Sequence, residues 1–567
     1  MKRSLSDLEN NEFDLIVIGG GIFGVCAAWD ATLRGLSVAI IERGDFGCAT
    51  SANSYKIVHG GLRYVQHGDV YRIRQSSNER RALSRIAPHL VHPLPIVVPT
   101  YGHGMKGKEV LRIGMGLYDL FTLDRNRNIA APSRHIPRCR FMSRLEVLNL
   151  FPNVNSAGLT GGALFHDGQI YNPTRLILAF LRSAFQAGAV TANYVEATKF
   201  IQHKNRVCGV EAKDNLTGAT MHIRGKVVLN AAGPYAERLL NSSIDTQLSP
   251  KATYSRDACL VVARRLTGDY ALAVQAKTSD PDAILSRGPR HLFIAPWRHY
   301  TLIGVWHKVY TGDPDKFTVT DEDLQTFLNE INESYPTLEL TLNDVALWNA
   351  GLVLFGTNDE GKEDLSYGHR SRIIDHAKTH AVEGLITLIG VRVTTGRGDA
   401  AEAVNIICNK IGHRALQSNT AITPIHGGDI DNIDDFMRSA LKNRPTNISI
   451  DVMRSLVRNY GTHCGDVIRL IKQNADLGTT IGNSTTIKAQ VAYACREEMA
   501  QRLADVVLRR TDLGTGEYPG RCTIESCGQL MATEMGWDKN RTRQEVEKTV
   551  ECYPSNIRLR HEYTTDT

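Results

Sequence analysis

A glycine-rich run near the N-terminus, GGGIFG at residues 19–24, is the feature that most constrains how this chain can fold. The apolar run at residues 13–18 comes directly before it, as is typical of a buried parallel strand. A helical pattern covers residues 25–34, and a second apolar run at residues 36–41 follows a glycine. Strand, glycines, helix and strand in this order predict a βαβ unit.

Each glycine of this run suits a different requirement of dinucleotide binding. Gly19 allows the tight turn, Gly21 lets the backbone approach a pyrophosphate, and Gly24 lets the helix pack on the strand. The N-terminus of the helix offers free N–H groups and a partial positive charge to the phosphates. Glu42, at the end of the second strand, can hold ribose hydroxyls and argues against the 2′-phosphate of NADP. A purely structural glycine turn is the alternative, but the ordered elements around it favour a bound dinucleotide.

The composition is that of an ordinary folded protein and argues against several classes. A length of 567 residues favours several domains, and 42% hydrophobic residues can fill large cores. Lys and Arg total 66 against 60 Asp and Glu, and this net charge of +6 indicates no dedicated nucleic-acid binder. It suits anionic substrates or an anionic membrane surface. The 11 cysteines are scattered without a CxxC pair, which predicts a reduced protein with no metal site.

Membrane attachment and assembly are left open by the sequence. The N-terminus has no signal-peptide core, and the apolar runs are too short for a transmembrane helix, so we expect a cytoplasmic protein. The apolar and basic stretch at residues 105–121 is a candidate for peripheral contact with the inner face of the cytoplasmic membrane, and a buried helix is the alternative. The Arg-rich stretch at residues 71–86 is interpreted as a solvated helix, and a homodimer is left open.

A second motif, TSANSYKIVHGGLRY at residues 50–64, carries the most specific signal. Its Ser, Thr and Asn side chains supply hydrogen bonds, and its paired glycines let a flat ring approach the backbone. Together with Glu42, this stretch resembles the FAD-dependent glycerol-3-phosphate dehydrogenases and oxidases, within the class of amine- and alcohol-oxidising flavoproteins. A glycine turn with a surface Arg-Tyr pair is the alternative to this interpretation.

The resemblance extends over about residues 13–545. It continues in RIAPHLVHPL at residues 85–94, NAAGP at residues 230–234, FIAPW at residues 293–297 and GVRVTTGR at residues 390–397. The resemblance implies FAD as the cofactor, because the βαβ unit alone does not separate FAD from NAD. The implied cofactor-binding residues are Gly19, Gly21, Gly24, Glu42, Thr50, Ser51, His59, Gly60, Gly233, Pro234, Gly390, Thr394 and Thr395.

The resemblance also implies a reaction, in which sn-glycerol 3-phosphate is oxidised to dihydroxyacetone phosphate by hydride transfer to FAD. Electrons would then pass to a quinone or to oxygen. His59 is the first candidate for the proton acceptor, and His307 is the second. The implied residues for substrate binding are Arg63, Tyr64, Arg392 and Arg397, of which Arg63 and Arg392 would also take part in catalysis.

Several positions depart from the family pattern. Val353 stands where the family has an arginine, His307 where it has an aspartate, and Arg392 where it has a lysine. Loss of one arginine from a phosphate site lowers the binding free energy of the phosphate by about 1.5–3 kcal/mol. Arg392 can compensate for this loss, because a guanidinium can bind phosphate through two nitrogens. The alternative is therefore a related FAD oxidoreductase for another phosphorylated or anionic polyol or sugar, or a binding protein that has lost turnover.

The expected fold class is α/β, with a Rossmann-like FAD-binding domain, an inserted strand-rich substrate domain and a C-terminal α-helical domain. The first two form residues 1–410. The segments are about 13–80, 150–240 and 350–410 for the FAD domain, about 81–149 and 241–349 for the substrate domain, 411–447 for a linker and 448–567 for the helical domain. Helical patterns at residues 486–510, 524–535 and 541–553 support the last assignment.

Overall fold

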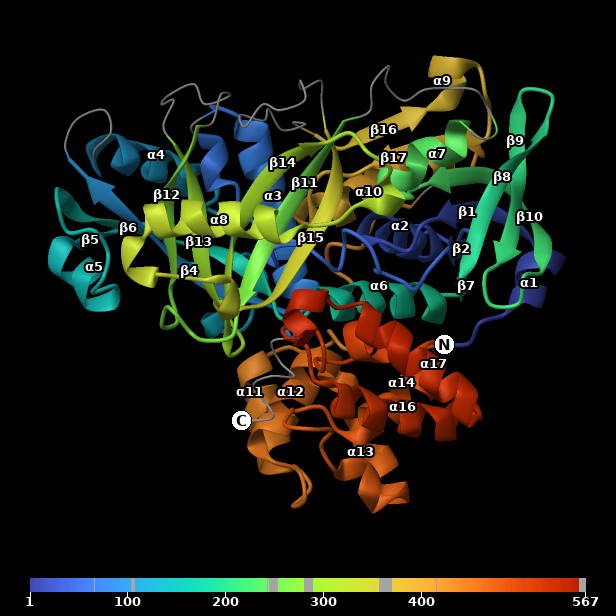
Figure 1. Ribbon diagram of the computed structural model, residues 1–567. Coiled ribbons are helices and arrows are strands. Elements are labelled where there is room, and N and C mark those ends of the chain that lie inside the picture. The colour runs from blue at the N-terminus through green and yellow to red at the C-terminus, as the bar shows by residue number, and fades with distance from the viewer. Residues whose placement is uncertain are drawn as a thin grey trace.

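The apolar runs on either side of the glycine turn form the centre of a parallel sheet in the computed structural model (Figure 1). The structure describes residues 1–65, 67–102, 108–241, 243, 253–279, 289–355, 370–414 and 416–559. The α/β part lies beside a strand-rich part, and a bundle of helices lies below both in the view of Figure 1. This arrangement confirms the expected α/β class with its strand-rich and helical additions.

The first sheet follows the order β16-β17-β10-β1-β2-β7 in the described part of the chain, and β8 and β9 extend it from β10. Its strands are β1 (Glu12–Ile18), β2 (Val38–Glu42), β7 (Val190–Asn193), β8 (Val195–His203), β9 (Arg206–Asp214), β10 (Thr220–Asn230), β16 (Arg372–Asp375) and β17 (Leu385–Ile389). The neighbours β17, β10, β1, β2 and β7 run parallel, so their carboxyl ends meet at one edge. β1 is central and apolar because both of its faces are covered.

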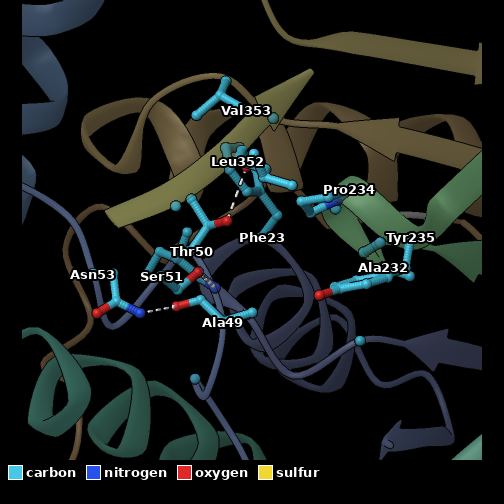
Figure 2. Close-up of a pocket in the computed structure, with 18 of the residues that line it drawn as sticks. Phe23, Ala49, Thr50, Ser51, Asn53, Ala232, Pro234, Tyr235, Leu352 and Val353 are labelled. Atoms are coloured by element: carbon cyan, nitrogen blue, oxygen red, sulfur yellow. Dashed lines mark hydrogen bonds between the residues drawn. The ribbon is translucent and has the colours of Figure 1, made fainter. Parts of the chain in front are cut away.

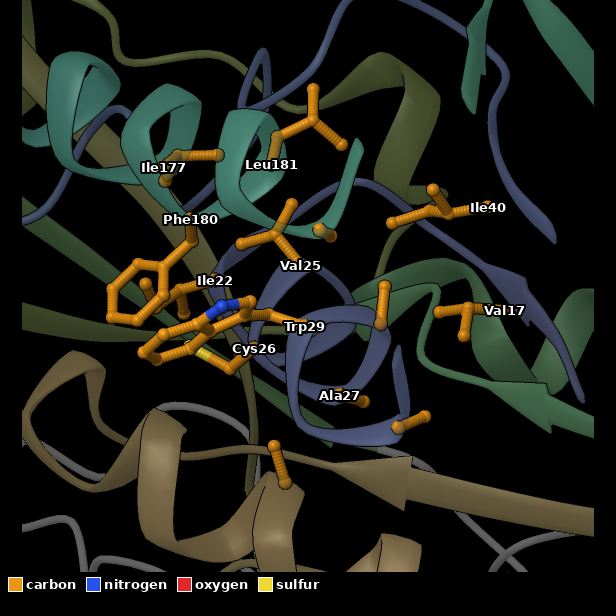
Figure 3. Packing of buried hydrophobic residues seen from close by; sticks show 14 of the residues in the cluster. Val17, Ile22, Val25, Cys26, Ala27, Trp29, Ile40, Ile177, Phe180 and Leu181 are labelled. Carbon is orange, nitrogen blue, oxygen red and sulfur yellow. The ribbon is translucent and has the colours of Figure 1, made fainter. Parts of the chain in front are cut away.

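Three helices cover one face of this sheet. They are α2 (Ile22–Leu33), α6 (Pro173–Gln186) and α10 (Gly396–Lys410), with α2 in contact with the other two. α2 is apolar nearly all round, as a fully covered helix must be. Trp29 of α2 meets Phe180 of α6 edge to face with ring centroids 5.5 Å apart, and Ile177 and Leu181 close the same cluster (Figure 3). This packing fixes the direction in which the N-terminus of α2 points.

The second sheet follows the order β15-β11-β14-β13-β12-β4-β6-β3 in the described residues, with β5 beside β6. Its strands are β3 (Ile57–Val58), β4 (Val91–Tyr101), β5 (Arg140–Ser143), β6 (Leu159–Ile170), β11 (Thr253–Val262), β12 (Ala271–Ser279), β13 (Pro289–Trp297), β14 (Tyr300–Tyr310) and β15 (Val345–Phe355). The second sheet includes strands that lie outside the residue ranges expected for the substrate domain, about 81–149 and 241–349. β6 belongs here because it pairs along β4, and β15 belongs here because it pairs along β11.

The remaining helices of these two parts are mostly short. They are α1 (Leu5–Asn10), α3 (Val70–Ile86), α4 (Lys108–Phe121), α5 (Arg144–Leu150), α7 (Ala236–Asn241), α8 (Asp321–Ser334) and α9 (His376–His380), with single turns η1 (Leu62–Val65), η3 (Pro132–Arg134), η4 (Gly233–Tyr235), η5 (Pro314–Lys316), η6 (Pro336–Leu338), η7 (Leu342–Asp344) and η8 (Val393–Thr395). α8 buries Phe327 and Leu328 against the second sheet. In the described part of the chain, no helix combines the length and apolar character that crossing a bilayer requires.

The C-terminal part is helical, as expected, but its boundaries differ from the prediction. Its elements are α11 (Ile433–Lys442), α12 (Ile450–Tyr460), η9 (Gly461–His463), α13 (Cys464–Gln473), η10 (Ala475–Gly478), α14 (Lys488–Glu497), α15 (Leu503–Asp505), the π-helical turn η11 (Val506–Arg510), α16 (Arg521–Met535) and α17 (Lys539–Glu551). The linker expected at residues 411–447 is shorter, because α11 packs on α12. The helix expected at residues 486–510 is broken where Met499 takes a left-handed backbone with φ +57°.

One half-buried carboxylate ties the helical part to the start of α6 and to the second sheet. Asp512 accepts hydrogen bonds from Tyr171 at 3.1 Å, from Asn172 at 2.9 Å and from Asn459 at 2.7 Å. Arg298, between β13 and β14, makes an ion pair of 2.5 Å with the same carboxylate. The helical part is therefore attached through directional polar contacts as well as apolar packing.

Candidate active site

A cavity of about 940 Å³ lies where the two sheets meet. Its lining comes from parts of residues 18–23, 42–59, 231–239, 257–259, 350–353 and 388–394, with further residues from β8, β9, β14 and the turn at residues 314–317. The first sheet contributes the loops after β1, β2, β10 and β17, since the carboxyl ends of these parallel strands share one edge. The volume is within the range of cofactor sites.

The glycine turn after β1 has no room for side chains at two positions. A Cβ on Gly24 would lie 1.9 Å from the carbonyl oxygen of Gly19, so α2 can approach β1 only with glycine there. Gly19 has φ +104°, and a Cβ on it would lie 2.6 Å from the carbonyl oxygen of Ala231. The first amides of α2 lack acceptors within the helix and begin at the cavity, where Ile22 and Phe23 line the wall.

Glu42, expected to hold a ribose, lies at the end of β2 and lines the cavity. Its carboxylate accepts hydrogen bonds from the backbone N–H groups of Gly20 at 2.7 Å and Gly44 at 2.9 Å. Burial raises the pKa of Glu42, and the two amides act in the opposite direction. The carboxylate therefore sits at the glycine turn, where a ribose beside the pyrophosphate would meet it.

The loop at residues 49–54 crosses the cavity wall (Figure 2). Thr50 donates a hydrogen bond of 2.9 Å to the carbonyl oxygen of Leu352 on β15. Ser51 accepts one of 3.0 Å from the backbone N–H of Ile22, the first residue of α2. The loop thus joins the second sheet to the N-terminus of α2, and both Thr50 and Ser51 lie on the cavity surface.

His59 occupies another part of the same cavity, next to the loop that follows β17. Its backbone N–H donates to Thr394 Oγ1 at 3.1 Å, which brings residues 335 positions apart in the sequence into contact. Its ring Nδ1 lies 3.1 Å from Asp167 Oδ2 on β6. Burial alone would raise the pKa of Asp167, but His59 and Arg80 hold it below its ordinary value. An ionised Asp167 can keep the Nδ1 proton of the imidazole and leave Nε2 as the basic nitrogen.

Asp167 is a site residue that the sequence interpretation did not assign. Its second oxygen accepts the backbone N–H of Gly60 at 2.7 Å and lies 3.3 Å from Arg80 Nη1. The pairing of Val58 with Gly168 places this carboxylate beside the histidine. That register joins residues more than 100 positions apart, so local patterns carried no signal for it.

Ten of the thirteen expected cofactor residues line the cavity, namely Gly19, Gly21, Glu42, Thr50, Ser51, His59, Gly233, Pro234, Gly390 and Thr394. The other three lie behind its wall. Gly24 permits the helix contact already described, Gly60 leaves space for Arg80, and Thr395 donates a hydrogen bond of 2.7 Å to Asp399.

The donor set and shape of this cavity fit FAD. Gly233 has φ +57°, and a Cβ on it would meet no atom within 4 Å, so its place on the wall is open space. The cavity runs from the phosphate-type glycine turn to His59, Gly390 and Arg392 on distant segments. A dinucleotide with a large ring system at one end matches this series of contacts.

The expected substrate residues are only partly brought together. Arg392 lines the cavity, and its guanidinium donates to the Tyr64 hydroxyl. Tyr64 lies behind Arg392, and the Cζ atom of Arg392 is 5.1 Å from the centroid of the Tyr64 ring in a cation–π arrangement. The backbone of Arg63 belongs to η1, but its side chain lies outside the described residues.

Two expected residues lie away from the cavity lining. Arg397 makes a buried ion pair with Glu79 and donates a hydrogen bond of 2.9 Å to Thr420, so its guanidinium is committed within the protein. The structure therefore does not support a substrate role for Arg397. His307 Nδ1 lies 2.7 Å from Asp257 Oδ1, and Asp257, not His307, is the lining residue. As the second choice for the base, His307 is disfavoured by this placement.

Gly24→Ala should abolish FAD retention, because its Cβ would overlap the carbonyl oxygen of Gly19 and displace α2 from β1. Gly116→Ala is the matched control, since a Cβ on this helical glycine meets nothing within 4 Å. The flavin absorbance per mole of purified protein measures the effect. A Gly24→Ala protein that holds FAD like the control would contradict this role for the turn.

Comparisons with known proteins agree with this site. A model of the family described as FAD dependent oxidoreductase matches residues 14–392, and one described as the C-terminal domain of alpha-glycerophosphate oxidase matches residues 418–542. The chain is 30% identical to glycerol-3-phosphate dehydrogenase of Synechocystis sp., covering 98% of both chains. It is 29% identical to alpha-glycerophosphate oxidase of Streptococcus pyogenes, covering 90% of both.

The fold is also that of a solved structure. Glycerol-3-phosphate dehydrogenase from Bacillus halodurans, complexed with FAD, superposes with a TM-score of 0.73 at 24% sequence identity. The match covers 96% of this chain and 95% of that one, so it includes the C-terminal helices. With its two family domains, its near full-length relatives and its glycine turn, the chain belongs to the FAD-dependent oxidoreductase family.

Proposed function

We propose that this protein oxidises sn-glycerol 3-phosphate to dihydroxyacetone phosphate with FAD as its cofactor. The relatives that match nearly its whole length are named glycerol-3-phosphate dehydrogenase or alpha-glycerophosphate oxidase. The observation that carries the proposal is that a carboxylate-bound histidine and an arginine line the same cavity. His59 supplies a base and Arg392 a cation, which are what oxidation of a phosphorylated alcohol requires.

His59 acts on the hydroxyl of the substrate. Asp167 holds Nδ1, so Nε2 is the nitrogen that accepts the hydroxyl proton as the carbinol carbon is oxidised. FAD, when bound, supplies the acceptor for the hydride that leaves this carbon. The positive charge gained by the imidazole is balanced by the ionised Asp167 beside it, and Arg80 balances that carboxylate in the buried layer behind.

Arg392 binds the phosphate of the substrate. A guanidinium offers paired N–H donors to phosphate oxygens, and the hydrogen bond to Tyr64 holds its orientation. The wall made by β11 and β15 contributes Asp257 and Val353, which give a phosphate dianion no cation. The phosphate is therefore assigned to the Arg392 side of the cavity, and the change from arginine to valine at residue 353 is compatible with that assignment.

Under anaerobic conditions, sn-glycerol 3-phosphate should bleach the flavin absorbance of the purified protein, while glycerol at the same concentration should not. Glycerol lacks the phosphate that Arg392 would bind. Arg392→Met should raise the concentration for half-bleaching by about 10- to 100-fold, which corresponds to a lost charge-assisted hydrogen bond. A holoprotein that glycerol 3-phosphate leaves oxidised would reject this substrate, and equal bleaching by glycerol would reject the phosphate site.

Asp167→Asn should lower kcat by at least about tenfold, because an amide does not balance the positive charge that the His59 imidazole gains with the substrate proton. His59→Gln removes the base itself and should lower kcat at least as far. The rate of anaerobic flavin bleaching at saturating sn-glycerol 3-phosphate measures both effects. An unchanged rate in Asp167→Asn would show that the carboxylate serves only structure.

For the onward transfer of electrons, we propose a quinone or oxygen as the acceptor. The names of the relatives include both a dehydrogenase and an oxidase. The rate at which the reduced protein regains its flavin absorbance in air, compared with that in a soluble quinone without oxygen, separates the two.

We further propose that α4 rests on an anionic membrane surface. Ile113, Leu117 and Leu120 follow each other at helical spacing and are exposed by 67%, 43% and 59%. Leu123, just beyond the helix, extends the apolar face, and Arg112 is an exposed cation beside it. An amphipathic helix of this kind lies in the plane of the lipid headgroups.

The double variant Ile113→Ser with Leu120→Ser should weaken binding to phosphatidylglycerol vesicles at least about tenfold, because two large apolar side chains no longer enter the bilayer. Co-sedimentation with vesicles measures this, and activity with a soluble acceptor should stay unchanged. Unaltered vesicle binding would contradict the assignment. A dimer that the same variant dissociates in solution would instead identify the face as the contact of a homodimer.

A further inference from the structure

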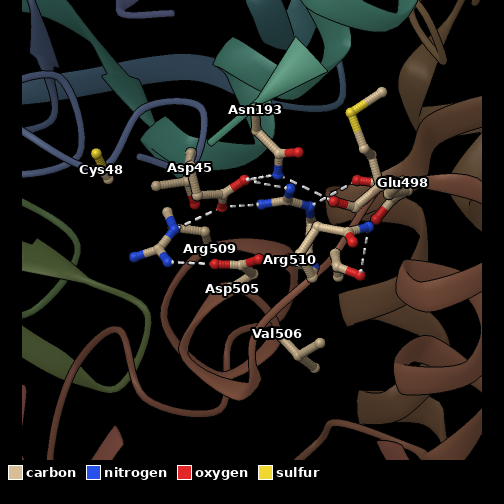
Figure 4. Close-up of polar contacts among 12 residues, drawn as sticks. Asp45, Cys48, Asn193, Glu498, Asp505, Val506, Arg509 and Arg510 are labelled. Atoms are coloured by element: carbon tan, nitrogen blue, oxygen red, sulfur yellow. Dashed lines mark hydrogen bonds and ion pairs between the residues drawn. The ribbon is translucent and has the colours of Figure 1, made fainter. Parts of the chain in front are cut away.

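The loop that follows β2, residues 43–51, is bound to the C-terminal helical part through the buried carboxylate of Asp45 (Figure 4). Arg509 Nε lies 2.6 Å from Asp45 Oδ2. Arg510 holds the same carboxylate through two nitrogens, at 2.5 Å from Oδ2 and 2.7 Å from Oδ1. The side chain of Asp45 is fully buried, and that of Arg510 almost so. A bidentate, water-excluded pair of this kind fixes both distance and direction.

The two arginines are themselves held in place. Arg509 Nη2 lies 2.7 Å from Asp505 Oδ1, which also accepts a hydrogen bond of 2.6 Å from the Tyr194 hydroxyl. Arg510 Nε donates to the carbonyl oxygen of Glu498 at 3.1 Å. Burial alone would raise the pKa of Asp45, yet Arg510 and Arg509 hold it well below its ordinary value. Asp45 is therefore ionised, and two arginines face two aspartates in this cluster.

The residues after Asp45 pass directly to the glycine turn. The backbone N–H of Gly47 donates to the carbonyl oxygen of Gly20 at 3.0 Å. The ring of Phe46 fills the space beside Gly20 so closely that a Cβ there would lie 2.4 Å from it. Cys48, which follows Gly47, lines the cavity, and so do Thr50 and Ser51 further along the loop. A shift of Asp45 would therefore move both the pyrophosphate turn and the hydroxyl residues of the cofactor loop.

We infer that the C-terminal helical part is a clamp for FAD, and that Asp45 is the positioning residue through which Arg509 and Arg510 hold the cofactor loop in its binding conformation. None of these three residues touches the cofactor itself in this assignment. The inference requires FAD in the cavity but does not depend on the identity of the substrate, so it and the proposed oxidation of glycerol 3-phosphate can fail separately.

The chain contains a matched control for this cluster. Glu498 is also fully buried at the boundary of the helical part, and it also faces two arginines. Arg175 Nη1 lies 2.8 and 2.7 Å from its two oxygens, and Arg182 Nη1 lies 3.2 Å from one of them. Both arginines belong to α6, which lies outside the cofactor loop. Loss of the Glu498 carboxylate should lower the stability of the protein about as much as loss of the Asp45 carboxylate does. It should not move residues 43–51.

The experiment compares Asp45→Asn with Glu498→Gln, two changes of carboxylate to amide in similar settings. The dissociation constant of FAD, measured by the quenching of flavin fluorescence on titration into apoprotein, should rise at least about tenfold for Asp45→Asn. For Glu498→Gln the dissociation constant should stay within about threefold of that of the unaltered protein. The temperature of unfolding should fall by a similar amount in both variants. An unchanged constant for Asp45→Asn, or equal changes in both variants, would overturn the inference.

A second measurement locates the effect. Hydrogen–deuterium exchange of the FAD-bound proteins should increase over residues 43–51 in Asp45→Asn and not in Glu498→Gln, since only the former releases the loop. If Asp45→Asn fails to fold, Arg510→Lys is compared with Arg182→Lys, because Arg182 contacts the Glu498 carboxylate and belongs to α6. Lysine keeps the charge, and at residue 510 it loses the two-nitrogen contact with Asp45. Unaltered exchange and FAD affinity in Arg510→Lys would equally refute the clamp.

Discussion

The close approach of α2 to the end of β1 is the contact on which the rest of the site depends. It exists because Gly24 has no Cβ to meet the carbonyl oxygen of Gly19, and it directs the positive end of the helix into the cavity. The parallel strands β2, β10 and β17 then deliver their following loops to the same edge. Glu42, Gly233 and Thr394 reach one cavity in this way, although they are far apart in the sequence. The position of the cavity is thus a property of the first sheet, and the second sheet supplies the opposite wall.

Two carboxylates outside the cavity give this arrangement its chemistry and its fixed shape. Asp167 sits behind His59 and determines which nitrogen of the imidazole faces the cavity. Asp45 sits behind the cofactor loop and connects it to the helical part of the chain. Both are buried, and both are compensated by arginines, as buried charges must be. The groups that would touch FAD or substrate are therefore held by a second set of charged residues.

The sequence predicted those features that depend on neighbouring residues. The elements β1, α2 and β2 follow from apolar runs and glycines. Contacts set by sheet register could not be predicted in this way. His59 meets Asp167 across 108 residues, and Arg397 meets Glu79 across 318, which removes that arginine from the expected substrate site. The break at Met499 could not be predicted from local patterns either, since its side chain is buried in the core beside α2 and α6 rather than among the C-terminal helices.

A crystal structure of the chain with FAD bound would show where the cofactor lies. We expect the pyrophosphate at the first turn of α2, the ribose at Glu42, and the ring system beside His59 and Thr394. A pyrophosphate bound away from the glycine turn, or a ring system that does not reach His59, would contradict both the cofactor site and the role given to that histidine.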